Sequence, residues 1–249
     1  MIKRAFDLVS ATVGLVLLSP LLLPIMFLIW VYDFGSPFYR APRVGKSGRK
    51  FPMTKFRSMV MNADKSGVDS TASSDSRITP VGRFVRRTKL DEIMQLWNVV
   101  CGDMSLVGPR PNLPSAVALN TKREMDLLSV RPGVTDMSSI VFADEGDILD
   151  RFDDPDLAYH QYIRPWKHRL GLLYVKNSSI SLDIRLILLT LVQLFSRERA
   201  LRRVSDLVGR LTSDAELQRV CLRTEPLQAA PPPGAAHVVE SRELRVAEL

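Results

Sequence analysis

The sequence has 249 residues, of which 46% are hydrophobic and 24% are charged, and its formal net charge is +7. This length suits one good-sized domain with appendages, and the charge favours an anionic partner such as nucleic acid, anionic lipid or a phosphorylated small molecule. The two cysteines, Cys101 and Cys221, lie far apart. They argue against a disulfide framework and a CxxC zinc site, so a reducing compartment is the simplest explanation.

The first predicted element is an uncharged run from Leu8 to Val31, LVSATVGLVLLSPLLLPIMFLIWV. A helix of this length is enough to cross the roughly 30 Å hydrocarbon core of a bilayer. A secretory signal explains the run less well, because it exceeds the usual apolar region of roughly 7–15 residues and no convincing cleavage site follows. We therefore expect residues 1–36 to form a membrane segment.

The flanks of this segment favour a re-entrant helix. Lys3 and Arg4 precede it, and several basic residues between 40 and 57 follow it, so both ends are expected on the cytoplasmic side. Ser19-Pro20 near the middle, with Pro24 beyond, bias the helix to bend, and the Ser19 hydroxyl can bond a freed carbonyl. The alternative is a kinked helix that spans the membrane, since membrane helices tolerate proline.

The next hundred residues predict short strands, loops and a broken helix. Glycines and prolines over 37–60 are typical of loops and short strands, and the polar stretch 62–76 of a mobile surface loop. Apolar spacing over 81–97 predicts one or two helices broken near Thr88. The segment 102–114 should form a fixed loop, because prolines flank Arg110 on both sides.

The C-terminal half predicts mainly helices, with a turn at RPGVT. Helices are expected over 115–129, 155–176 and 181–196, and the last is too short and too charged for a confident span but could lie in the membrane interface. Residues 197–223 are typical of an amphipathic helix on a partner or membrane surface. The rest, 224–249, reads as disordered. The expected organisation is therefore a membrane helix over 1–36, a catalytic domain over 37–196, this amphipathic helix and the tail.

An adjacent pair of acids, Asp91 and Glu92, follows a group of cations. A structural explanation is that both acids begin a helix capped by Thr88, where the helix dipole favours negative charge. The two side chains would project about 100° apart, so they cannot act from opposite sides of a bond as a glycosidase pair does. The cations between residues 77 and 89 have no acid after Asp75 to pair with; they are Arg77, Arg83, Arg86, Arg87 and Lys89.

Five cations need more anions than two carboxylates supply, and a phosphorylated substrate would provide them. The same positive field should lower the pKa of Asp91 and keep it ionised as a nucleophile. A carboxylate here could also bind Mg²⁺, and the ion would bridge it to a diphosphate. The alternatives are a solvated basic face and a patch that touches anionic lipid.

Three further features carry a functional and a structural explanation each. Arg110 between its prolines suits an anion, or pairs with a carboxylate of its own loop. Lys55 and Arg57, in TKFRSM, are further candidate cations, or lie on a solvated strand edge. His160 and His168 have no third ligand at metal spacing and are expected on the surface. GxSxG, GxxxxGK[ST], HExxH and nucleic-acid-binding motifs are absent from the sequence.

Five blocks of sequence carry a family resemblance: KRAFDLVSATVGLVLLSPLL, KFRSM, GRFVRRTKLDEIMQLWNVVCGDMSLVGPRPNLP, RPGVT and YVKNSSISLDIRLILLT. They closely resemble the bacterial sugar transferases, the monotopic phosphoglycosyl transferases that start glycan assembly on a polyprenol carrier. The resemblance runs from Lys3 to about Leu194, and its long central block is highly specific. It implies an α/β fold, mostly helical with a small sheet, on the cytoplasmic face of the bacterial inner membrane. A re-entrant helix broken at Ser19-Pro20 and interfacial amphipathic helices would seat it there.

The resemblance also implies a reaction and roles for residues. Asp91 would attack the β-phosphate of a UDP-sugar, giving a phosphosugar-enzyme intermediate and UMP, and polyprenyl (undecaprenyl) phosphate would then take the phosphosugar. Asp91 would be the Mg²⁺ ligand, and Glu92 would assist metal placement or proton handling. Arg86 and Arg110 would hold phosphates with help from Lys55. The product would enter exopolysaccharide, capsule or O-antigen assembly.

The chain departs from the family pattern after RPGVT. Many relatives continue with a glycine, a tryptophan and a glutamine before a second glycine-arginine pair, whereas this chain reads DMSSIVFADEGDILDRF. That region would be expected to touch the sugar or the nucleotide, so the sequence does not predict which sugar is used. A non-catalytic membrane scaffold of the same fold is the competing hypothesis, and the intact acid pair argues against it. Self-association stays open, and no nucleic-acid partner is expected.

Overall fold

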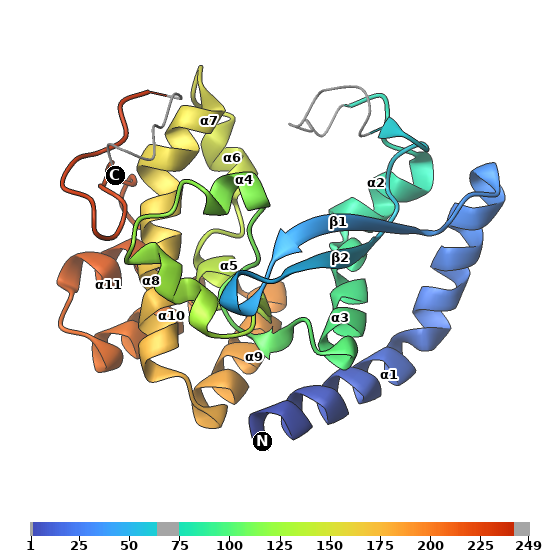
Figure 1. The fold of residues 1–249 in the computed structure, drawn as a ribbon, viewed down its shortest axis with the longest axis horizontal. Helices are drawn as coiled ribbons and strands as arrows, with labels where there is room; N and C mark the ends of the chain where they lie inside the picture. The colour runs from blue at the N-terminus through green and yellow to red at the C-terminus, as the bar shows by residue number, and fades with distance from the viewer. Residues whose placement is uncertain (1, 64–74, 242–249) are drawn as a thin grey trace. The chain divides into compact units, whose positions relative to one another are not determined.

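The computed structural model describes residues 2–63 and 75–241, and most of the expected loop over 62–76 therefore lies outside the described residues (Figure 1). The chain divides into two compact units. The first contains residues up to 42 and 51–104, and the second contains 43–50 and 105 onward. The described chain is mostly helical with two small two-stranded sheets. This confirms the expected secondary-structure content, and the expected domain boundaries stay a prediction.

The first unit begins with a long apolar helix, α1 (Ile2–Asp33). Pro20 has no N–H to offer the carbonyl of Val16, and the Ser19 hydroxyl donates to that carbonyl instead at 2.7 Å. The ribbon of α1 bends along its length in Figure 1. Within the described chain this is the one helix long and apolar enough to cross a membrane.

A pair of strands follows, β1 (Phe38–Val44) and β2 (Lys50–Phe56), joined through a short 3₁₀ turn, η1 (Lys46–Gly48). One buried side chain ties β2 to the helix α3 (Gln95–Cys101). The Asn98 carboxamide accepts from the Thr54 N–H at 2.8 Å and donates to the Pro52 carbonyl at 2.9 Å. Asn98 thus makes the hydrogen bonds that a further strand would otherwise make.

Between the strands and α3 lie α2 (Pro80–Arg87) and a 3₁₀ helix, η3 (Leu90–Met94). The predicted break near Thr88 is confirmed, because Lys89 adopts a left-handed conformation with φ 54°. The predicted capping role of Thr88 is wrong. Its hydroxyl bonds the Phe84 carbonyl behind it at 2.8 Å and so closes α2.

The core of the first unit is small and joins α1 to the strands and to the short helices. Its buried members are Leu22, Ile25, Ile29, Phe56, Val85 and Met94. Leu22, Ile25 and Ile29 of α1 are buried in this core, and Leu15, Leu18 and Met26 pack against it while partly exposed. Other apolar side chains of α1, such as Val13, Leu17, Leu23 and Phe27, are exposed.

The second unit contains a short parallel sheet of β3 (Ser105–Val107) and β4 (Gly133–Thr135), with Ser105 opposite Gly133. A Cβ on Gly133 would lie 2.0 Å from the Gly108 nitrogen. Only glycine permits this approach, so the RPGVT segment expected as a turn forms a strand after its Arg-Pro.

Helices surround this sheet. The predicted helix over 155–176 is confirmed as α7 (Pro155–Ala158), a π-helical turn η5 (Tyr159–Ile163) and α8 (Arg164–Asn177). The one predicted over 181–196 is confirmed as α9 (Ile180–Phe195). Two short helices, α5 (Met137–Val141) and α6 (Glu145–Leu149), fill the segment between β4 and α7.

The helix predicted over 115–129 is wrong, because the chain forms α4 (Pro114–Val117) and a separate 3₁₀ helix, η4 (Glu124–Ser129). A capping box begins η4. The Glu124 carboxylate accepts from the Thr121 N–H at 2.8 Å, and the Thr121 hydroxyl accepts from the Glu124 N–H at 3.1 Å. The T-x-x-E capping signal therefore starts a new helix within the segment where the apolar periodicity predicted one continuous helix.

The single amphipathic helix predicted over 197–223 is also wrong. It is two helices, α10 (Arg197–Leu211) and α11 (Ala215–Leu222), and the Asp214 carboxylate caps the second at 2.9 Å. The apolar stripe expected on a partner or membrane is instead buried in the core of the second unit; it includes Leu201, Val204, Leu207 and Val208.

The tail differs from the disorder expected over 224–249. Residues 224–241 have no helix or strand, but Ala230 and Val239 are buried. Trp166 donates to the Gln228 carbonyl at 3.1 Å, and Gln161 donates to the Val239 carbonyl at 2.7 Å. The expectation for 242–249 lies outside the described residues.

Gly82 is a test of how α2 is held. A Cβ there would lie 1.9 Å from the Ser58 carbonyl oxygen, whereas a Cβ at Gly146 meets nothing within 4 Å. We expect Gly82→Ala to lower the free energy of unfolding by about 1–3 kcal/mol, as overpacking does, and Gly146→Ala to leave it unchanged or slightly higher. Thermal unfolding in detergent measures both. Equal melting temperatures for the two variants would contradict the close contact.

Candidate functional site

The predicted acid pair lies on η3 in the first unit. With three residues per turn, the side chains of Asp91 and Glu92 leave this helix roughly 120° apart. Lys55 reaches Glu92 from β2, with 3.4 Å between Nζ and Oε1. Arg86, on α2, lies close enough to act on the charge of Asp91. The structure therefore places the pair Asp91 and Glu92 in one unit with Lys55 and Arg86, while the fifth predicted site residue, Arg110, lies elsewhere.

Burial dominates the electrostatics of Asp91. It raises the pKa of this carboxyl above its ordinary value, and the negative charge of Glu92 adds to the effect. Lys55 and Arg86 oppose the rise without cancelling it. The predicted lowering of this pKa is therefore wrong for the protein alone, because removal of water outweighs the two cations.

The basic residues before η3 are not equivalent. Arg77 already has an acidic partner, since its guanidinium holds Asp75 at 2.7 Å and also bonds the Ala63 carbonyl. The pairing lowers the pKa of Asp75 to about 2. Arg83 and Arg87 are exposed, whereas Arg86 is half-buried. Of these cations, Arg86 is the one placed to act on the acid pair.

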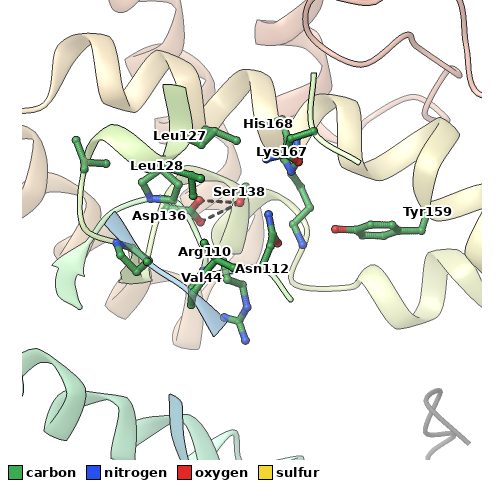
Figure 2. A pocket seen from close by; sticks show the side chains of 16 residues that line it. Val44, Arg110, Asn112, Leu127, Leu128, Asp136, Ser138, Tyr159, Lys167 and His168 are labelled. Atoms are coloured by element: carbon green, nitrogen blue, oxygen red, sulfur yellow. Dashed lines mark hydrogen bonds between the residues drawn. The ribbon is translucent and has the colours of Figure 1, made fainter. Parts of the chain in front are cut away.

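Arg110 belongs to the second unit. Its loop is held as predicted, because the Pro109 carbonyl accepts from the Gly133 N–H at 3.0 Å and the Asn112 carbonyl from the Val44 N–H at 3.0 Å. The side chain of Arg110 lines a pocket of this unit (Figure 2). Asn112, Tyr159, Lys167 and His168 also line it.

His168 contradicts the prediction of a surface histidine. It is buried, and its Nδ1 lies 2.7 Å from the carboxylate of Glu124, which has no exposed surface. Arg164 donates to the same carboxylate at 2.9 Å. His160 is half-buried. The capping signal of Thr121 and Glu124 was visible in the sequence, but nothing there indicated that the second oxygen of Glu124 meets a histidine of α8.

The donor set at the acid pair fits a shared magnesium ion and not an all-protein cage. Among the described residues no group of three or more Asp, Glu, His and Cys side chains could hold a metal ion. Mg²⁺ is commonly bound by one or two carboxylates together with substrate phosphates. Asp91 and Glu92 suit that arrangement.

Comparison with known proteins assigns the family. The model for the bacterial sugar transferase family matches residues 1–197. The UDP-glucose:undecaprenyl-phosphate glucose-1-phosphate transferase of Escherichia coli (strain K12) is 34% identical over 207 residues, 80% of this chain and 41% of that protein. The UDP-N-acetylgalactosamine-undecaprenyl-phosphate N-acetylgalactosaminephosphotransferase of Aeromonas hydrophila is 34% identical over 194 residues, 76% of this chain and 43% of that protein. The exopolysaccharide production protein ExoY of Rhizobium meliloti (strain 1021) is 34% identical over 183 residues, 67% of this chain and 78% of that protein.

The chain thus spans less than half the length of the first two of these relatives. The matched segment ends at residue 197, the first residue of α10, so it leaves out nearly all of α10, α11 and the packed tail. Those elements therefore lie outside the part of the chain that the family model describes, although they share a core with it.

The charge of Asp91 provides a prediction that does not depend on any reaction. Because Lys55 lowers the pKa of Asp91, Lys55→Met should raise that pKa further, so that the carboxyl ionises at higher pH. Lys50→Met, which changes an exposed lysine at the start of the same strand, should leave the pKa of Asp91 unchanged. The carboxyl ¹³C shift of Asp91, assigned through its loss in Asp91→Asn, measures the titration. An unchanged midpoint in Lys55→Met would refute the coupling.

Proposed function

Because this chain belongs to the bacterial sugar transferase family, we propose that it transfers a sugar-1-phosphate from a UDP-sugar to undecaprenyl phosphate and releases UMP. Relatives named for this type of transfer use glucose, galactose or N-acetylgalactosamine. The observation that carries the proposal is the partly buried Asp91 carboxylate beside Glu92, with Lys55 and Arg86 near it.

In the proposed first step, an Asp91 oxygen attacks the β-phosphorus of the UDP-sugar. The bond from that phosphorus to the bridging oxygen breaks, and its electron pair leaves with UMP. Asp91 then carries the sugar phosphate as an acyl phosphate. A desolvated carboxylate suits this role, because it has little hydration to lose before it attacks.

In the second step, an oxygen of undecaprenyl phosphate attacks the same phosphorus, and the Asp91 carboxylate leaves. The product is undecaprenyl diphosphate sugar, and the enzyme is regenerated. Two substrates of opposite solubility can thus react in turn at one nucleophile.

Each remaining residue has a role in this scheme. Lys55 holds Glu92 in place and supplies positive charge, and Arg86 stabilises the phosphate oxygens beside Asp91. Arg110 binds a phosphate of the donor from its proline-flanked loop. Mg²⁺, held by Asp91 with Glu92 assisting, would neutralise charge on the diphosphate of the donor and on the UMP that leaves.

The same proposal places the chain on the bacterial inner membrane with its site on the cytoplasmic face. α1 supports this location, because exposure of so many apolar side chains to water is unfavourable and a bilayer would cover them. They include Val13, Val16, Leu17, Leu23 and Phe27. Basic residues at both flanks and the Ser19-Pro20 bend favour a re-entrant path. α9 is a candidate interfacial helix, since it buries one face and exposes Ile184, Leu188, Leu191, Leu194 and Phe195.

The reaction is tested by UMP release in nanodiscs from UDP-glucose, UDP-galactose and their N-acetylated forms, with undecaprenyl phosphate and Mg²⁺. We expect release from at least one donor and a loss of roughly 10³-fold or more in Asp91→Asn. Without the acceptor, wild type should give a burst stoichiometric with enzyme. Asp126→Asn, at an exposed position, is the matched control.

The inactive variant must also be folded. Since burial disfavours the ionised form of Asp91, the neutral amide removes that cost at neutral pH, and Asp91→Asn should melt no lower than wild type. Activity that survives in Asp91→Asn would reject Asp91 as the nucleophile. If folded wild-type protein releases no UMP from any of the four donors, a rarer sugar or the non-catalytic scaffold hypothesis would be favoured.

The path of α1 is tested by labelling single cysteines in spheroplasts with a membrane-impermeant thiol reagent, in a Cys101→Ser background. A re-entrant helix predicts that Ile2→Cys and Ser36→Cys both react only after permeabilisation. A spanning helix would expose one of the two to the outside reagent in intact cells. The buried Cys221, whose pKa burial raises to about 12, should stay silent.

A further inference from the structure

The exposed aromatic side chains of α1 gather at the end of the helix that leads into β1. Between Ile2 and Leu23, every large apolar side chain that α1 exposes is aliphatic. The exposed aromatic side chains lie in the last turns of the helix and directly after it; they are Phe27, Trp30, Tyr32 and Phe34. The two parts of α1 therefore present different surfaces, and the aromatic part has no role in the reaction steps above.

Three of these side chains form a row, which we call the aromatic row: Phe27, Trp30 and Phe34. The ring centres of Phe27 and Trp30 are 6.1 Å apart, and those of Trp30 and Phe34 are 5.3 Å apart in an edge-to-face contact. Spacings of three and four residues place the rings on one side of the helix. The rings touch one another, yet Phe27 is 60% and Phe34 72% exposed.

Phe34 holds its ring in this row at a cost to its backbone. Its φ is 52°, the left-handed region that glycine adopts most easily and that a bulky residue rarely adopts. The Phe34 N–H donates to the Trp30 carbonyl at 2.6 Å, a cap that also brings the two side chains together. Because the ring stays exposed, packing within the protein compensates little of this strain.

The glycine that follows does not take the strained position. The Gly35 N–H donates to the Asp33 carboxylate at 3.0 Å, and a Cβ on Gly35 would lie 2.7 Å from Nη1 of Arg57. Gly35 is therefore needed where Arg57 approaches the chain to bond Asp33 at 2.8 Å. The surface of the protein changes from aromatic to charged between Phe34 and this ion pair.

An aromatic row beside an ion pair suits the boundary between lipid and water. Water alone would leave the apolar surface of the rings exposed, and the bilayer centre would remove water from Asp33 and Arg57, which is costly. Phenylalanine and tryptophan rings at the boundary keep their apolar bodies in lipid, and the tryptophan N–H can reach polar groups there. The exposed aliphatic surface of α1 runs into the row without a break, so a bilayer that covers the first reaches the second.

We propose that the aromatic row binds the glycerol and upper acyl-chain region of bilayer lipids and fixes the depth at which this end of α1 lies. The left-handed conformation of Phe34 is then compensated by contact with lipid. This rests on the proposed membrane location, and it holds for a re-entrant and for a spanning path of α1 alike. Since Arg57 joins this end of α1 to the end of β2, the row also sets the height of the strand that carries Lys55.

Fluorescence of Trp30 in the full chain tests the contact with lipid. In a Trp97→Phe background the other tryptophan is Trp166, which is buried in the core of the second unit and out of reach of lipid. The chain is placed in vesicles of phosphatidylethanolamine and phosphatidylglycerol, some of them brominated near the ester end and others near the methyl end of the acyl chains. We expect bromine near the ester end to quench Trp30 about twofold more strongly.

Three substitutions test the role of the row in setting depth. Phe34→Gly removes the ring together with the backbone strain, so the preference for ester-end quenching should disappear while the melting temperature in detergent stays unchanged or rises. Phe34→Tyr keeps a ring and should keep the preference. Leu17→Ala is the matched control, because it removes exposed apolar surface from the same helix outside the row. It should leave the preference unchanged.

Each contrary result would overturn the proposal. Equal or stronger quenching from the methyl end in the parent would place Trp30 in the hydrocarbon. No quenching from either end would show that protein covers the row, either a second copy of the chain or another membrane protein. An unchanged preference in Phe34→Gly, or an equal change in Leu17→Ala, would show that the row does not set the depth.

A marked drop in the melting temperature of Phe34→Gly, or its failure to fold, would assign the ring to packing within the first unit and also overturn the proposal. Quenching requires no turnover. These results therefore remain distinct from a failure of UMP release.

Discussion

The first unit depends on the buried carboxamide of Asn98. This side chain holds the backbone of β2 to α3, and β2 presents Lys55 to Glu92. The C-terminal end of α3 is in turn held by α1, because Arg4 donates to the carbonyls of Val99 and Val100. A cation is favourable there, because the last carbonyls of a helix carry the negative end of its dipole.

The other end of α1 is tied to Arg57, the residue that directly follows β2. The guanidinium of Arg57 donates to Asp33 at 2.8 Å and to the Ile29 carbonyl at 3.3 Å. Arg57 lies on the chain two residues after Lys55. The apolar helix and the acid pair are thus joined through short polar contacts at both ends of α1. In a membrane-bound enzyme, such contacts would set the depth of the site from the position of the helix.

How much the sequence could predict depended on whether a signal was local. Proline and serine in α1, the break at Thr88 and the apolar periods of α8 and α9 act within a few residues, and each appeared where it was expected. The helices expected over 115–129 and 197–223 failed for a related reason. Caps at Thr121 and Asp214 interrupt an apolar period that looks continuous, because a side-chain cap can satisfy the backbone wherever the chain turns.

In the candidate site, too, features that depend on neighbouring residues could be predicted, and features that depend on distant contacts could not. The acid pair and its cations stood together in one stretch, so Asp91, Glu92 and Arg86 could be named as candidates. Lys55 was a candidate cation from its own stretch, and only the family resemblance linked it to the acid pair. The pKa of Asp91 could not, because desolvation depends on what packs over the carboxyl and not on which charges precede it. His168 was missed because its partner, Glu124, is 44 residues away in the chain.

Both acidic centres are desolvated, and burial alone would raise the pKa of each carboxyl, but the net shifts are opposite. At Glu124 the charge is compensated on all sides by Arg164, His168 and a backbone N–H, so the carboxylate stays ionised and fixed. At Asp91 the compensation is incomplete, and the pKa rises. Under the proposed function, a metal ion or an electrophilic phosphorus would stabilise the ionised Asp91 that its own surroundings leave under-stabilised. The imbalance would then be a cost to folding that bound substrate removes, as expected of a group that reacts and not of one that holds its neighbours in place.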